Sequence, residues 1–105
     1  MEAKIVLTTC PAGDLAEEIA VKLVDEKAAA CVNIIPGVLS CYRWKGRIER
    51  ENESLLIIKT AGNNLETLRR KLEKLHPYEV PEFVVLDVEA LSESYGAWLS
   101  ESLGL

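Results

Sequence analysis

The stretch that decides the fold is "ACVNIIPGVLSCYRWKGRIERENESLLIIKT", residues 30–60. Lys45-Gly46 is typical of a tight hairpin turn, so the runs on either side are predicted to pair as antiparallel strands, over 30–44 and 47–60. Proline cannot donate to a sheet ladder and glycine weakens one, so we expect a bulge or bend at Pro36-Gly37. The returning strand is polar in its outer half and apolar in its inner half. These features predict a long, bent hairpin whose inner half belongs to a core.

Before the hairpin, the sequence predicts one strand and one helix. The strand covers 4–9 and is closed by Pro11 and Gly13, which interrupt extended structure. Asp14 then precedes a run with apolar residues at helical spacing, and Glu17 stands in the capping-box position three residues later. We therefore expect a helix that is capped by Asp14 and ends near Lys27.

After the hairpin, a helix, a strand and a final helix are predicted. The helix covers 64–75, is capped by Asn63, and ends at His76 because the residue before a proline is pushed out of the helical region. The strand "PEFVVLDVEAL", 81–91, is apolar enough to be central or well covered, and Ser92 begins the last helix. The order is that of an α+β, ferredoxin-like split β-α-β sandwich, extended by an unusually long bent hairpin and a C-terminal helix.

Composition limits the classes of protein that this chain can be. Its 105 residues, 49% of them apolar, form a single domain over 1–105 that can bury roughly 65% of its unfolded surface. We expect no membrane partner and a cytoplasmic location, because no apolar run approaches ~18 residues and the start lacks signal-peptide features. A net charge of −5 argues against nucleic acid. The basic cluster Arg69-Arg70-Lys71 is interpreted as a solvated helix face, since Glu66 and Glu73 lie within a turn.

The chain has three cysteines, an odd number without a C-x-x-C pair, so we predict no disulfide. Cys31 and Cys41 lie in apolar, strand-like sequence and are expected to be buried as small hydrophobic residues. Cys10 follows the first strand and precedes the Pro11 to Gly13 break, so we expect it near the surface, where it can reach a metal ion.

Three segments together carry a family resemblance: "KAAACVNIIPGVLSCYRWKGRIERENESLLIIKT", "LHPYEVPEFVVLDV" and "YGAWL". In this order and spacing they resemble the CutA family, the divalent-cation tolerance proteins, over nearly the whole chain. The resemblance implies the ferredoxin-like fold, a tight homotrimer similar in shape to PII-type signalling proteins, and a link to tolerance of copper and other divalent cations. Copper-linked members have a cysteine late in the first strand and a His-His pair before the proline; here Thr8 and Leu75-His76 stand at those positions. A trimer also agrees with the long second strand, because typical strands have ~5–6 residues and the surplus needs a partner.

The only histidine of the chain organises the predicted metal site. His76, Cys10 and Glu79 would offer an imidazole, a thiolate and a carboxylate, which suit Cu(II) or Zn(II). We predict weak binding of copper or another divalent cation and no organic cofactor. The other interpretation of His76 is a helix C-cap that bonds free carbonyls at the negative end of the helix dipole, with a loss of about 0.5–1 kcal/mol on removal.

A second hypothesis is a PII-like signalling or adaptor protein that binds a small anion or a protein partner in clefts between subunits. Its predicted ligand-binding residues are Tyr42, Trp44, Lys59, Tyr78 and Glu82, with Lys59 as the anion contact and Glu79 also at the cleft. An enzyme is not predicted. His76 is the only histidine that could activate a nucleophile, and no oxyanion-hole motif or phosphate-binding glycine loop is present.

Overall fold

The computed structural model describes all residues, 1–105, and has the predicted order of elements. A short 3-10 turn, Gly62–Asn64, leads into the second helix. The remaining elements are β1 (Ala3–Pro11), α1 (Leu15–Asp25), β2 (Cys31–Trp44), β3 (Arg47–Ala61), α2 (Leu65–Leu75), β4 (Val84–Asp87) and α3 (Glu93–Ser102).

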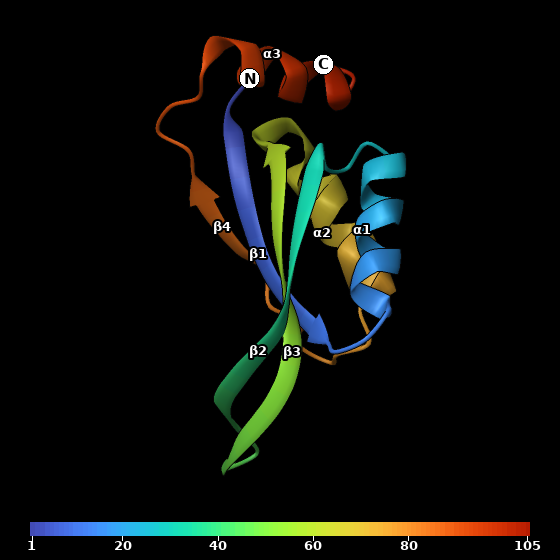
Figure 1. The fold of residues 1–105 in the computed structure, drawn as a ribbon, viewed down its shortest axis with the longest axis vertical. Coiled ribbons are helices and arrows are strands. Elements are labelled where there is room, and N and C mark those ends of the chain that lie inside the picture. Colours follow the sequence, from blue (N-terminus) through green and yellow to red (C-terminus); the bar gives the residue numbers. More distant parts are fainter.

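The four strands form one antiparallel sheet in the order β2-β3-β1-β4. Because β3 lies between β1 and β2, the first β-α-β unit is split, as the ferredoxin-like prediction requires. Helices α1 and α2 lie side by side on one face of this sheet, and α3 crosses the end near the N-terminus (Figure 1). The opposite face of the sheet has no helix over it (Figure 1).

The β2–β3 hairpin extends well beyond the body of the domain (Figure 1), and the whole chain with this hairpin is 45 Å long. The pairing register shifts between Ile35 and Val38, so the bulge predicted at Pro36-Gly37 is confirmed. Gly37 has a φ of 72°, a left-handed conformation that glycine adopts without strain. At the tip, Lys45 and Gly46 have φ values of 49° and 78°, the two positive φ angles of a tight hairpin turn.

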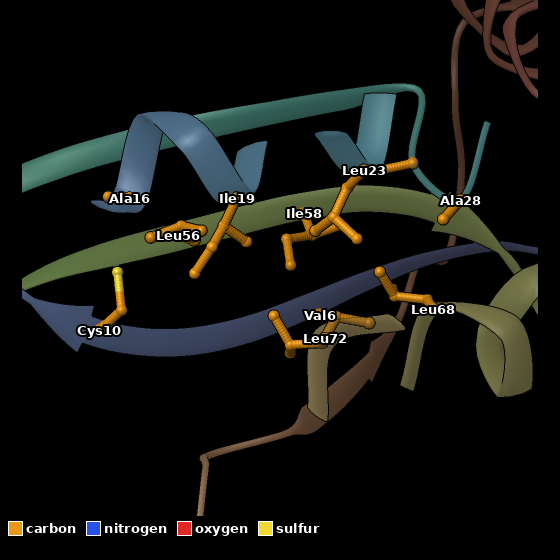
Figure 2. Close-up of a cluster of buried hydrophobic side chains, with 11 residues drawn as sticks. Val6, Cys10, Ala16, Ile19, Leu23, Ala28, Leu56, Ile58, Leu68 and Leu72 are labelled. Carbon is orange, nitrogen blue, oxygen red and sulfur yellow. The ribbon is translucent and has the colours of Figure 1, made fainter. Parts of the chain in front are cut away.

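The core lies between the sheet and helices α1 and α2 (Figure 2). Alternate residues of β1 point into it, because side chains along a strand alternate between the two faces. These include Val6, Thr8 and Cys10, all fully buried. Figure 2 shows the Cys10 sulfur within this cluster, so the expectation that Cys10 lies near the surface was wrong. The main core consists of Val6, Cys10, Ala16, Ile19, Leu23, Ala28, Ala29, Leu56, Ile58, Leu68 and Leu72.

Neither of the two predicted helix caps makes a capping hydrogen bond. The side chain of Asp14 makes no capping hydrogen bond. The residue before α2 is Asn64 and not Asn63, and its side-chain amide donates to the carbonyl of Lys27, 3.0 Å away, in place of capping. The last helix follows Ser92, as predicted, and the Oγ of this residue caps it by accepting from the backbone N–H of Tyr95 at 3.3 Å.

The fourth strand differs most from its prediction. It covers only Val84–Asp87 and not 81–91, and it is an edge strand that pairs with β1 alone. All four of its residues are exposed, so it is neither central nor covered within this chain. The ladder with β1 begins at Val84, which pairs with Leu7, and Pro81, which has no N–H, lies outside it.

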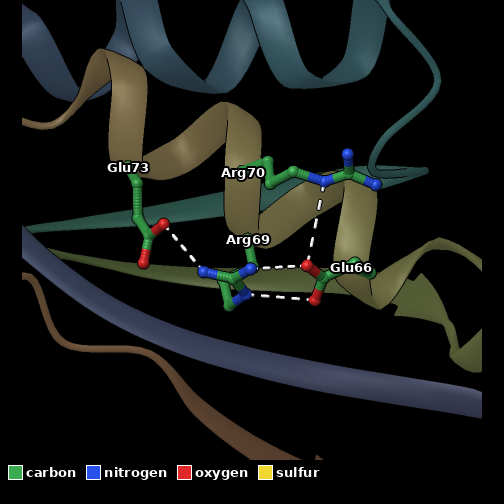
Figure 3. Close-up of polar contacts among 4 residues, drawn as sticks. All are labelled: Glu66, Arg69, Arg70 and Glu73. Atoms are coloured by element: carbon green, nitrogen blue, oxygen red, sulfur yellow. Dashed lines mark hydrogen bonds and ion pairs between the residues drawn. The ribbon is translucent and has the colours of Figure 1, made fainter.

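The basic cluster on α2 is a network of ion pairs at the surface, as interpreted from the sequence (Figure 3). Arg69 bonds Glu66 and Glu73, one on each side along the helix. Lys71 reaches Glu26, the residue that follows α1, with 2.6 Å between Nζ and Oε1, and so links α2 to the end of α1. None of the helices is both long and apolar enough to cross a membrane.

Candidate functional site

The crossover from α2 to β4, residues 76–83, is fixed at its start by His76. Helix α2 ends at this residue, whose φ and ψ of −81° and 133° are extended. Its Nδ1 accepts from the backbone N–H of Tyr78 at 3.2 Å, so the proton is on Nε2, which donates to the carbonyl of Thr9 at 2.7 Å. The imidazole therefore ties the crossover to the end of β1 and bonds no free carbonyl of α2.

The structure does not bring the three predicted metal ligands together. His76 is buried with both ring nitrogens hydrogen-bonded, Cys10 lies in the core, and Glu79 is exposed. Burial, and then the negative charge of Glu53, raise the pKa of the Cys10 thiol, which disfavours the thiolate that binds metals. No three His, Cys, Asp or Glu side chains are arranged so that they could hold a metal ion.

A pocket of about 630 Å³ opens between the outer hairpin and the crossover. Five of the predicted site residues line it: Tyr42 and Trp44 from β2, and Tyr78, Glu79 and Glu82 from the crossover. Lys59 does not belong to this pocket. It lies in β3, paired with Ile5 and Cys31, on the sheet face opposite the helices.

Glu53 is the one buried residue among those that line the pocket, and sequence reasoning missed it. Its side chain is only 4% exposed, and its Oε2 accepts the hydroxyl of Tyr78 at 2.5 Å. The sequence feature that could have identified Glu53 is its position, because β3 changes from polar to apolar there. In the structure Glu53 pairs with Val38, the first residue after the bulge. A strand that bends there leaves room for a carboxylate beside the crossover.

The electrostatics of the pocket are negative. Desolvation, followed by the charge of Glu53, raises the pKa of the Glu82 carboxyl. Burial and the hydrogen bond to Glu53 hold the pKa of Tyr78 far above its usual value. Burial and three neighbouring glutamates also raise the pKa of Tyr42. An added negative charge is disfavoured in such a field and a positive charge is favoured, so the pocket is suited to cations.

The exposure of the two other cysteines also differs from prediction. Cys41 lies at the mouth of the pocket and is exposed, and Cys31 is half-buried on the open sheet face. All three cysteines are free thiols, as predicted.

Comparisons with known proteins identify the family. The family model of the CutA1 divalent ion tolerance protein matches residues 4–102. A divalent-cation tolerance protein CutA of Thermus thermophilus is 43% identical over 101 residues, which cover 96% of this chain and 98% of the relative. One of Citrobacter koseri is 40% identical over 102 residues, covering 97% of this chain and 89% of the relative.

Solved structures agree with these sequence matches. The CutA1 structure of Thermus thermophilus superimposes with a TM-score of 0.92 at 42% identity, covering 95% of this chain and 97% of the other. CutA1 of Oryza sativa superimposes with a TM-score of 0.94 at 36% identity, covering 97% of this chain and 94% of the other. A CutA structure from Archaeoglobus fulgidus, described as periplasmic, superimposes with a TM-score of 0.93 at 31% identity. The match covers 96% of this chain and 98% of the other. From its sequence and its fold, the chain belongs to the CutA1 family of divalent ion tolerance proteins.

Proposed function

We propose that this chain acts in divalent-cation tolerance by binding divalent cations, copper among them, weakly and reversibly in the pocket between hairpin and crossover. The observation that carries the proposal is Glu53, a buried carboxylate without a cationic partner, with Glu79 and Glu82 at the same pocket. Buried charges in proteins are normally paired or bound to metals, so an incoming cation stabilises this carboxylate.

The chemistry of the available ligands supports weak binding. A tight site for Cu(II) or Zn(II) uses fixed nitrogen and sulfur ligands. Here His76 can ligate only by giving up one of its ring hydrogen bonds, to Thr9 or to Tyr78, and Cys10 only by leaving the core. Carboxylate oxygens, Glu79 among them, are the donors that line the pocket, and they are not preassembled around one point, which agrees with weak binding.

Calorimetric titration with Cu(II) and Zn(II) tests this function. We expect Glu53→Gln, which keeps an acceptor for the Tyr78 hydroxyl, to lower Cu(II) affinity at least about tenfold, or ~1.4 kcal/mol. Glu101→Gln removes an exposed carboxylate on α3 and should leave it unchanged. Affinity that survives Glu53→Gln but is lost in His76→Gln or Cys10→Ser would assign the ligands to the imidazole or the thiol. No binding by the wild type at millimolar metal contradicts the proposal.

We also propose that the protein works as a homotrimer in the cytoplasm. The support for assembly is the open face of the sheet, where apolar residues stand in adjacent rows: Ile5 beside Leu86, and Leu7 between Ile57 and Val84. Single domains rarely leave such a face uncovered. Sedimentation should give three times the chain mass of 11.6 kDa at micromolar protein, and a monomer would contradict the proposal.

The three free thiols support the proposed cytoplasmic location, because they agree with a reducing compartment.

A further inference from the structure

Metal binding does not account for the aromatic walls of the pocket. Tyr42, Trp44 and Tyr78 line the same space as the three glutamates. A metal ion needs ligand atoms at short distances and gains little from aromatic rings. Aromatic faces beside carboxylates are instead the surroundings that proteins offer to organic cations, because the ring quadrupole attracts positive charge.

Glu53 supplies a fixed anchor for such a cation. Tyr78 bonds its Oε2, whereas its Oε1 accepts no hydrogen bond from the protein and is not sealed in the core. None of the seven ion pairs of the chain involves Glu53, Glu79 or Glu82. An ammonium group can donate N–H bonds to the free Oε1, which satisfies both the acceptor and the charge.

The rings of β2 supply the second part of the site. The ammonium of Lys45 already lies 5.8 Å from the centre of the Trp44 ring, so this indole accepts a cation on its face. Tyr42 lies two residues from Trp44 along β2, and alternation along a strand places both side chains on one face of the hairpin. Together they offer an apolar surface to an alkyl chain.

The size of the pocket and the arrangement of its charges select among organic cations. A volume of about 630 Å³ is within the roughly 300–1,000 Å³ of small-molecule sites. The carboxylates come from two segments, Glu53 from β3 and Glu79 and Glu82 from the crossover. A ligand with a charge at each end of a flexible chain can meet both segments at once, whereas a single charge meets one.

We propose that this pocket binds a short alkyl diammonium ion. One ammonium donates to Glu53 and the other to Glu82 or Glu79, and the chain lies against Tyr42 and Trp44. This proposal goes beyond metal binding. The proposed ligand is an organic cation, whereas the adaptor hypothesis predicted a small anion. That prediction relied on Lys59, which lies on the open sheet face outside the pocket.

The test uses 1,4-diaminobutane as the probe, titrated calorimetrically into the assembled protein in chelator-treated, amine-free buffer. Butylamine carries one charge and 1,4-butanediol carries none, so they separate charge from chain contact. We expect the diamine to bind at least about threefold more tightly than butylamine, and the diol to give no binding. Equal binding of diamine and diol, or no heat with millimolar diamine, would overturn the proposal.

Variants assign the site and separate it from metal binding. Glu53→Gln should weaken diamine binding at least about tenfold, and Trp44→Leu about threefold. Trp98→Leu is the matched control, since this tryptophan of α3 is 45% exposed, close to the 37% of Trp44, and lies outside the pocket. Trp44→Leu should leave Cu(II) affinity unchanged, because the indole is not a metal ligand.

Each outcome has a defined meaning. If Glu53→Gln does not fold, the exposed Glu82→Gln replaces it and should weaken diamine binding about threefold. Diamine affinity that is unchanged in the folded glutamate variants overturns the site. Copper binding without diamine binding removes this inference alone, whereas diamine binding without copper binding removes the proposed metal function alone.

Discussion

We expect Thr8→Val to make the protein more stable. Thr8 is fully buried in β1, and its Oγ1 has no hydrogen-bond partner. Burying a hydroxyl without a partner costs about 1–3 kcal/mol in protein mutational data. Valine has the same branched shape, and its extra methyl adds up to about 0.8 kcal/mol of apolar burial, less the strain of a slightly larger group. The free energy of unfolding should therefore rise by about 1–2 kcal/mol.

Thr60→Val is the matched control. Thr60 is also fully buried, on the neighbouring strand β3, but its hydroxyl donates to the carbonyl of Ala28 at 2.8 Å. Valine there leaves that carbonyl unsatisfied, so the same substitution should destabilise the protein by about 1–3 kcal/mol. Urea unfolding at one fixed protein concentration, with unchanged m-values, measures both. If the two variants lose stability equally, the reasoning from the unpartnered hydroxyl is wrong.

Three further predictions concern single groups. His76→Ala should lower the free energy of unfolding by about 2 kcal/mol, because it removes two buried hydrogen bonds. This is more than the loss expected if His76 only capped α2, and a change under about 0.5 kcal/mol would contradict it. Glu82→Gln should stabilise the protein at pH 7. The raised pKa of Glu82 means that folding favours its protonated form, so this gain should vanish below about pH 4, and a gain that persists there refutes the cause. In the native protein a thiol reagent should modify Cys41 first, Cys31 slowly and Cys10 only after unfolding; early modification of Cys10 would contradict its burial.

Elements with strong local signals could be predicted from the sequence. The hairpin turn at Lys45-Gly46, the bulge at Pro36-Gly37 and the end of α2 before Pro77 are all fixed by backbone chemistry of the residues themselves. The apolar run at β4 was predicted to be central or well covered and is an exposed edge strand in this chain. Hydrophobicity indicates that a segment is buried in the end, but not whether its own chain or another one covers it. Val84 and Leu86 are apolar yet exposed in one chain, and a neighbouring subunit of the proposed trimer would supply the missing cover.

The candidate site was only partly predictable. Tyr42, Trp44 and Tyr78 were expected at a cleft and do line one pocket. Cys10 was misplaced although alternation from Val6 along β1 puts it on the core face. Glu53 could not be recognised by residue type, because its role depends on the crossover that covers it, a contact between segments about 25 residues apart.

The bulge that divides the long hairpin has a consequence for local stability. The ladder between β1 and β3 ends at Glu53, so beyond the pair of Val38 and Glu53 the strands β2 and β3 pair only with each other. An isolated two-stranded ribbon is marginally stable in water. The outer amides, residues 38–52, should therefore open and exchange with solvent deuterium independently of the inner sheet in any subunit that stands alone. A neighbouring subunit or a ligand bound beside Tyr42 would keep these amides hydrogen-bonded and slow their exchange. The exchange rate of this one ribbon thus reports assembly and occupancy without any chemical probe attached to the protein.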